Sequence, residues 1–219
     1  MRGVIDYWAN IFTPDYLTSF FGQDELRTVN DWWHMGDRTI GRSVEEYVAD
    51  MDAAGVAKVV IPALQMKSFK QKKMLSEVSI EQVLRLKEKA PERIEVLYGI
   101  NGDKDVKTGV RELRRAIETN GCVGAHLHTY GFGLAIDDRR YYPYYEACDE
   151  LGVPVVMQVG HSAEHMPNEL GRPLLVDHLA LDFPELRIVC SHTGWPWVQE
   201  LVALAWKHPN VFIGTAAYH

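Results

Sequence analysis

The sequence predicts an α/β fold of the (β/α)8 barrel type, in which helices cover a curled parallel sheet. Short runs of strand character alternate with helical patterns along the 219 residues, as expected for a parallel sheet. Several strand runs are almost continuously apolar, as in VVIPAL, VPVVMQVG and RIVCSHTG, which is typical of strands buried on both faces. No glycine-rich phosphate motif follows the first run, which argues against a doubly wound nucleotide-binding sheet.

Seven runs are predicted to be strands, and each interval between them is long enough for a helix. The predicted strands span residues 3–10, 58–64, 93–101, 123–129, 153–160, 187–194 and 211–217. A complete barrel of this type has eight strands. We therefore expect a single domain over residues 1–219 that stops after strand seven, with strand eight absent from this chain. Such a chain is a fragment, a truncated gene product or a subunit completed by a partner.

Local start and stop signals place helices between these strands. Ser43 begins a capping box with Glu46, and the helix that follows ends at Gly55. Asp105 is a second N-cap candidate, ahead of apolar positions that recur at helical spacing. The remaining helices are predicted over residues 80–89, 141–151, 173–181 and 197–207.

Composition excludes several classes of protein. The net charge of -7 argues against a nucleic-acid partner, which would require a basic face. No run approaches the roughly 18 apolar residues of a membrane helix, and the start MRGVIDYW lacks a signal-peptide pattern. Cys122, Cys148 and Cys190 are expected to be free buried thiols. We expect a cytoplasmic homo-oligomer that acts on a small molecule, without nucleic acid or membrane.

Chemistry-bearing residues gather at the predicted strand ends, which meet at one mouth in a barrel. Asp6, Trp8 and Asn10 share one face of the first strand. The same rule brings His126, His128, Gln158 and His192 to the mouth, with His161 just beyond the fifth strand. All of these side chains should therefore face one cavity.

The histidines offer two kinds of chemistry. His126 and His128, with His161 as a third donor, could hold a metal or a substrate anion. The alternative is that they are packed structural histidines or loop residues. His192 precedes a glycine and a helix start, which suits general acid or base catalysis, and we predict Asp6 as its catalytic partner.

Aromatic and polar residues around the mouth predict binding of a planar or apolar carboxylate, although rim packing is the alternative. Arg172 is the predicted carboxylate anchor because guanidinium binds carboxylate through two parallel hydrogen bonds. The predicted substrate-binding residues are Trp8, Asn10, Trp33, His34, Gln158, Arg172 and Trp195.

Three segments have a recognisable pattern: VIDYWAN, GAHLHTYGFGLAIDDRRYYPYY and DFPELRIVCSHTGWPW. They resemble the amidohydrolase-related barrels that include aminocarboxymuconate-semialdehyde decarboxylase and resorcylate-type decarboxylases. The resemblance covers nearly the whole chain. It implies a hydrolase or carboxy-lyase that acts on a small aromatic or unsaturated carboxylate with a divalent metal, zinc or manganese.

The sequence departs from that family at the metal ligands. The family's first strand has Asp-x-His-x-His, whereas Trp8 and Asn10 occupy the histidine positions here. Gln158 stands at the fifth-strand histidine, and only His192 matches a functional position. Two interpretations follow. The chain is an enzyme whose metal site is changed or missing, or it is a catalytically inactive homologue or fragment that supports or regulates a full-length barrel.

Overall fold

The computed structural model describes residues 3–216 and contains a curled parallel sheet of seven strands. The strand order is β1-β2-β5-β6-β7-β8-β9, and every neighbouring pair is parallel. The strands are β1 (Val4–Asp6), β2 (Val56–Pro62), β5 (Ile94–Gly99), β6 (Gly124–Leu127), β7 (Val155–Gln158), β8 (Ile188–Ser191) and β9 (Val211–Ile213). Each lies within or overlaps a predicted strand, so the predicted barrel-type fold with an open sheet is confirmed.

Six of the helices follow the predicted positions. They are α3 (Val44–Ala54), α4 (Ile80–Lys89), α5 (Val106–Glu118), α6 (Tyr142–Glu150), α7 (Val176–Asp182) and α8 (Val198–Lys207). The capping box of Ser43 and Glu46 is formed, and Gly55 ends α3 in the left-handed conformation with φ of 71°. Asp105 caps α5 by accepting the backbone N–H of Thr108. The local signals in the sequence therefore set these helix ends.

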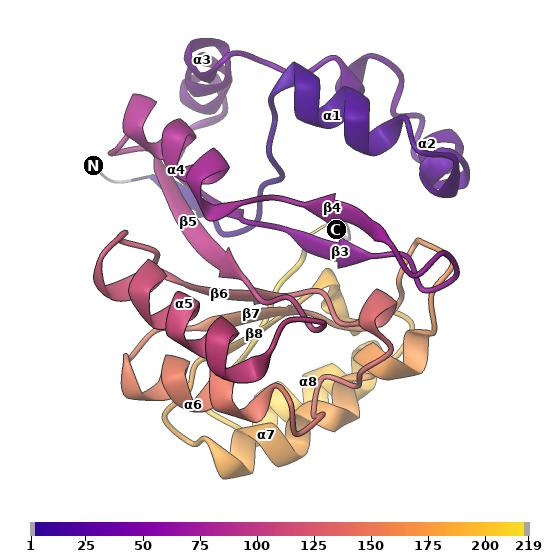
Figure 1. The fold of residues 1–219 in the computed structure, drawn as a ribbon, viewed down its shortest axis with the longest axis vertical. Coiled ribbons are helices and arrows are strands. Elements are labelled where there is room, and N and C mark those ends of the chain that lie inside the picture. The colour runs from indigo at the N-terminus through magenta and orange to yellow at the C-terminus, as the bar shows by residue number, and fades with distance from the viewer. Residues whose placement is uncertain (1–2, 217–219) are drawn as a thin grey trace.

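Two insertions were not predicted. Helices α1 (Pro14–Phe21) and α2 (Arg27–Trp32) follow β1, and an antiparallel hairpin of β3 (Gln65–Lys67) and β4 (Met74–Glu77) follows β2. Short 3-10 helices span Asp24–Leu26, Gly36–Thr39, Tyr130–Phe132, Asn168–Gly171, Pro173–Leu175 and His192–Gly194. In Figure 1, α5 to α8 lie along one side of the curled sheet, and α1, α2 and the hairpin lie on the other.

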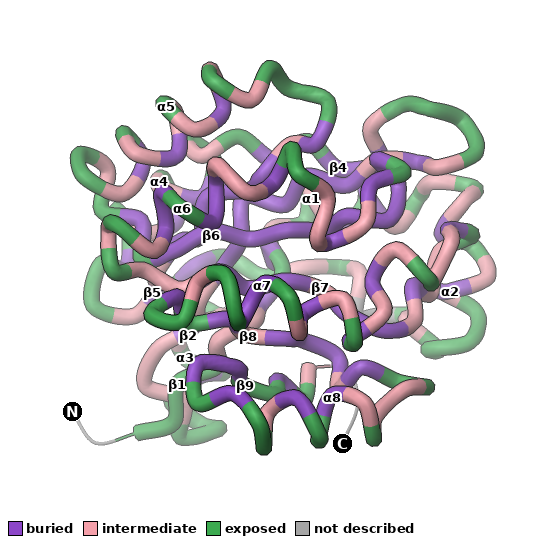
Figure 2. The backbone as a smooth tube through the Cα atoms, turned by 90° about the horizontal axis from the view of Figure 1, so that it is seen from below, coloured by how far each residue is buried: buried purple, intermediate pink, exposed green. Residues whose placement is uncertain are grey.

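The core follows the central strands, which appear as buried tubes in Figure 2. Side chains such as Ile61, Leu127 and Met157 are fully buried, because helices or other strands cover both faces of the sheet. The edge strand β1 differs, since all three of its residues are exposed. Cys122, Cys148 and Cys190 are buried free thiols, as predicted.

The predicted last strand, residues 211–217, extends to residue 217, which lies outside the described residues. Within residues 3–216, no helix combines the length and apolar character needed to cross a bilayer.

Candidate active site at the mouth of the sheet

A cavity of about 90 Å³ lies where the carboxyl ends of several strands meet. The sequence predicted seven of its lining residues: Trp8, Asn10, Trp33, His128, Gln158, His161 and His192. Helices α1 and α2, the 3-10 helix between them and the hairpin region cover this cavity with apolar side chains, among them Phe20, Phe21, Leu26, Val29 and Met66. The unpredicted insertions therefore supply the roof of the predicted site.

A hydrogen bond to the backbone fixes which ring nitrogen of His192 carries the proton. Its Nδ1–H donates to the carbonyl oxygen of Ala216 at 2.8 Å, since a carbonyl can only accept. In the neutral ring this leaves Nε2 as the nitrogen that can take up a proton. Burial lowers the pKa of His192, whereas the hydrogen bond to Ala216 and the charge of Glu164 oppose that shift. His192 is therefore a neutral base at pH 7.

The backbone at this strand end is strained. His192 and Thr193 both have positive φ, 69° and 55°, in a region that side chains with a Cβ rarely adopt. Each such residue costs on the order of 1–3 kcal/mol and persists only where the surroundings enforce it. Here Thr193 N–H donates to the carbonyl oxygen of Gly214 at 2.8 Å, beside β9. The strain presents the imidazole to the mouth.

His126 and His128 differ in position although both are buried, with 1% exposure each. The ring of His126 makes a tilted contact with the indole of Trp8, with 4.5 Å between ring centroids. His128 lines the cavity. The ring nitrogens of both have no hydrogen-bond partner among the described residues. Burial is the main cause that lowers the pKa of each, so both rings are neutral.

The side chains do not fit the metal site that the family resemblance implies. Within residues 3–216, no three histidine, cysteine or acidic side chains converge as a metal would require. The predicted ligands His126, His128 and His161 do not form such a group. Trp8 and Asn10 lie at the cavity in place of two imidazoles, and indole does not bind metals.

Five predicted site residues do not line the cavity: His126, described above, and Asp6, His34, Arg172 and Trp195. The exposed carboxylate of Asp6 accepts the backbone N–H of Trp8 at 3.1 Å, and His34 is exposed. Arg172 donates to both carboxylate oxygens of Glu200, at 2.7–3.2 Å. Trp195 is half-exposed and makes an edge contact with the ring of His161, 5.0 Å away.

Sequence reasoning missed Glu164, which lines the cavity from the loop after β7. The hydroxyl of Ser162 donates to its carboxylate at 2.6 Å. The segment GHSAEH contains both residues, but a loop has no periodicity that would show which side chains point inward.

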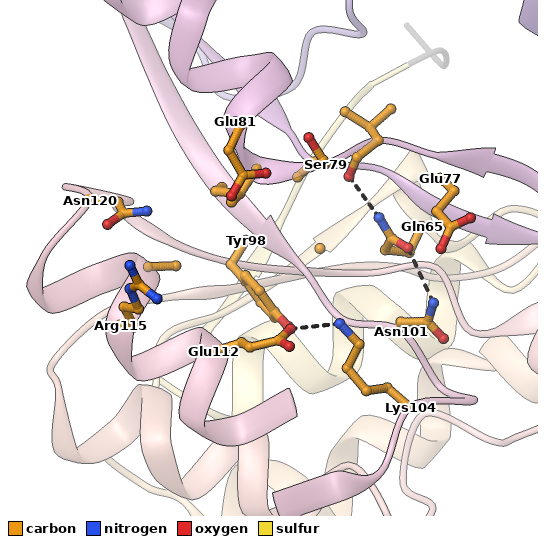
Figure 3. A pocket seen from close by; sticks show the side chains of 15 residues that line it. Gln65, Glu77, Ser79, Glu81, Tyr98, Asn101, Lys104, Glu112, Arg115 and Asn120 are labelled. Carbon is orange, nitrogen blue, oxygen red and sulfur yellow. Dashed lines mark hydrogen bonds and ion pairs between the residues drawn. The ribbon is translucent and has the colours of Figure 1, made fainter. Parts of the chain in front are cut away.

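A larger groove, about 550 Å³, lies outside the sheet between α4 and α5 (Figure 3). Its polar groups bind one another: the Tyr98 hydroxyl and the Lys104 ammonium both donate to the Glu112 carboxylate, at 3.2 and 2.6 Å. The amide of Gln65 likewise donates to the carbonyl oxygen of Val78 at 2.7 Å. None of the predicted site residues lines this groove, so the mouth cavity is the candidate active site.

Comparison with known proteins places this architecture in a family. The amidohydrolase family model matches residues 5–218. The chain belongs to the amidohydrolase family. The resemblance deduced from the sequence is thereby confirmed.

This amidohydrolase-family chain is similar to individual relatives at modest identity. It is 28% identical over 147 residues to a 2-keto-4-carboxy-3-hexenedioate hydratase of Sphingobium sp. (strain SYK-6). That match covers 53% of the chain and 43% of the hydratase, so less than half of the relative's length is spanned.

Two solved structures show the same fold. An uncharacterized TIM-barrel protein from Bordetella bronchiseptica is 25% identical with a TM-score of 0.75, over 97% of this chain and 74% of that one. A 5-carboxyvanillate decarboxylase from Novosphingobium aromaticivorans, crystallised with manganese and 4-hydroxy-3-methoxy-5-nitrobenzoic acid, is 17% identical with a TM-score of 0.65. That similarity covers 94% of this chain and 69% of the decarboxylase.

Proposed function

We propose that this chain is part of a lyase that hydrates a carbon–carbon double bond in a small unsaturated carboxylate. The observation behind the proposal is the mouth cavity, where His192 is a neutral base with its tautomer fixed by Ala216. A buried imidazole of this kind can accept or return one proton during the reaction.

The cavity walls favour a small, flat substrate. Trp8, Trp33 and Phe20 provide aromatic surfaces against which a conjugated system can pack. No arginine or lysine is among the described residues that line the cavity, so a substrate carboxylate would bind the side-chain amides of Asn10 and Gln158 and the imidazole N–H of His128. A volume of about 90 Å³ is well below the ~300–1,000 Å³ of drug-sized sites.

Hydration is preferred to decarboxylation on two grounds. The curated relative found by sequence, at 28% identity, is a hydratase, whereas the 5-carboxyvanillate decarboxylase, at 17%, is similar in fold. Addition of water also requires a proton acceptor and a proton donor, which a mouth rich in imidazoles supplies. No step is assigned to a metal, because the described donors do not fit one. Homo-oligomer formation and a cytoplasmic location stay predictions from the sequence.

The test is an activity assay with a matched pair of variants. The purified chain is incubated with 2-keto-4-carboxy-3-hexenedioate, and loss of the conjugated absorbance is recorded. Separate reactions with 5-carboxyvanillate and 2,6-dihydroxybenzoate are monitored for released CO2. We expect hydration that falls about 100-fold or more in His192→Asn and is unchanged in His178→Asn, which alters an exposed histidine on α7.

Each other outcome has a definite meaning. Release of CO2 without hydration would replace the proposed reaction by decarboxylation at the same site. A folded chain without activity on any of the three substrates would contradict the proposal and favour the non-catalytic homologue.

A further inference from the structure

The loop of residues 160–171, which follows β7, is closed and anchored at its base. The N–H of Gly160 donates to the carbonyl oxygen of Gly171 at 2.7 Å, so the two ends of the loop meet. The hydroxyl of the buried Tyr130 donates to the carbonyl oxygen of Gly160 at 3.1 Å. A Cβ on Gly171 would lie only 2.2 Å from that hydroxyl, which shows how closely the loop packs on the ring.

Within this loop, Ser162 orients Glu164. Ser162 is buried, with 3% exposure, and its own N–H donates to the side-chain oxygen of Asn168 at 2.9 Å. Its hydroxyl donates to Oε2 of Glu164 at 2.6 Å. The carboxylate is therefore held by a group that is itself fixed, and its second oxygen is left for another partner.

The same carboxylate faces the imidazoles of the mouth. Among the described residues that line the cavity, Glu164 is the single acidic side chain, and His128 and His192 line it from β6 and β8. Its negative charge acts to raise the pKa of both histidines against the effect of burial. A carboxylate and a neutral imidazole thus meet at one small cavity, an arrangement suited to accepting a proton and passing it on.

We propose that Glu164 is a catalytic residue of this site and that Ser162 is its positioning residue. The inference rests on the proposed hydration and names its second proton-transfer group. The carboxylate takes a proton from a water molecule, whose oxygen forms the new bond to one alkene carbon. That proton passes from Glu164 to the neutral His192, and the imidazolium so formed delivers it to the other alkene carbon. Both groups then return to their starting states, and one water is consumed.

The competing explanation is that Glu164 only closes the loop through its bond to Ser162. The two explanations differ in what a small carboxylate added from solution can do. A structural role is not restored by formate, whereas a missing proton acceptor is, because formate can enter the space left by a truncated side chain.

The experiment compares four variants of the full chain: E164Q, E164A, S162A and the control E169Q. Glu169 is on the same loop but exposed, and does not line the cavity. We expect E164Q to lower kcat about 100-fold with little change in KM, and S162A to lower it about 10-fold. Activity of E164A should rise with added formate, and E169Q should behave as wild type. Wild-type kcat in E164Q, or no effect of formate on E164A, would overturn the proposal.

A second measurement remains informative if the wild-type chain hydrates nothing. NMR titration of the His192 ring in wild type and E164Q reports whether the carboxylate faces it. We expect a lower pKa for His192 in E164Q, because a stabilising negative charge is removed. An unchanged pKa would show that Glu164 does not face His192 and would refute the inference independently of the proposed reaction.

Discussion

Tyr130 connects the loop of residues 160–171 to the barrel, and Tyr130→Phe tests whether that loop builds the site. The side chain is fully buried. Its hydroxyl donates to the carbonyl oxygen of Gly160 at 3.1 Å, and the carbonyl oxygen of Gln158 lies at 3.3 Å from the same hydroxyl. Phenylalanine keeps the ring and removes only the hydroxyl, so the perturbation is confined to the contacts of that hydroxyl, which include these two.

We expect Tyr130→Phe to lower both the stability of the fold and the catalytic activity. A buried carbonyl without its donor costs about 1–3 kcal/mol, and we expect a decrease of about 1–2 kcal/mol in the free energy of unfolding. For a chain of this length that corresponds to a drop in Tm of about 2–8 °C. A loop shifted by about 1 Å misplaces Glu164 and His161, so we also expect kcat/KM to fall roughly 10-fold.

Tyr145→Phe is the matched control. Tyr145 is equally buried and donates its hydroxyl to a backbone carbonyl, that of Ile136, at 2.5 Å. It does not line the mouth cavity. We therefore expect a similar loss of stability in urea unfolding but wild-type kcat/KM. Hydrogen exchange of the amides of residues 160–171 should accelerate in Tyr130→Phe only.

Two results would refute this reasoning. If Tyr130→Phe loses stability but keeps wild-type activity and loop exchange, the hydroxyl does not position the loop. If both variants lose activity equally, the effect comes from general destabilisation rather than from the loop.

Two further predictions concern other parts of the molecule. Asp177 accepts hydrogen bonds from His208 and Lys207, at 2.6 and 2.7 Å, which lower the pKa of its carboxyl group, so the stability they contribute is present above pH ~4 and is lost as the pH falls below that value. In urea unfolding, the difference in stability between wild type and Asp177→Asn should therefore shrink at acidic pH. A difference that stays constant with pH would contradict this role of Asp177. Replacing both Trp8 and Asn10 by histidine places two more imidazoles beside His126 and His128. We expect Mn²⁺ or Zn²⁺ to raise the Tm of this variant more than that of wild type. An equal rise in the two proteins would show that the present side chains already bind the metal.

The sequence predicted the sheet because buried parallel strands leave a strong local signal. Runs such as residues 59–64 and 153–157 are continuously apolar, and the burial of most of these residues in the structure explains why. The hairpin was missed because β3 and β4 are short and contain Gln65, Lys67 and Glu77, which break any apolar run. Its stability depends on packing against distant segments, which a single sequence does not show.

The site was predictable only where strand geometry fixes it. His128, Gln158 and His192 lie at the ends of strands, and the rule that such ends share one mouth places them correctly at the cavity. Glu164 and Arg172 belong to loops, where partners decide the outcome. Arg172 binds Glu200, 28 residues later in the chain, rather than lining the cavity. Nothing in the local sequence shows that Glu164 lines the cavity and that Arg172 does not.

The unfavourable features of the fold gather at the mouth, which is itself an argument for function. Within residues 3–216, five of the eight buried side-chain nitrogen and oxygen atoms that have no hydrogen-bond partner belong to His126, His128 and His161. Each such atom costs about 1–3 kcal/mol, and the left-handed backbone at His192 adds to that cost. Apolar side chains at the positions of the buried imidazoles would carry no polar atoms without partners, and glycine at position 192 would adopt the left-handed backbone without strain. Imidazole nitrogens that lack protein partners are useful only to a bound molecule, so the energetic cost of the mouth supports a ligand or substrate there rather than a purely structural barrel.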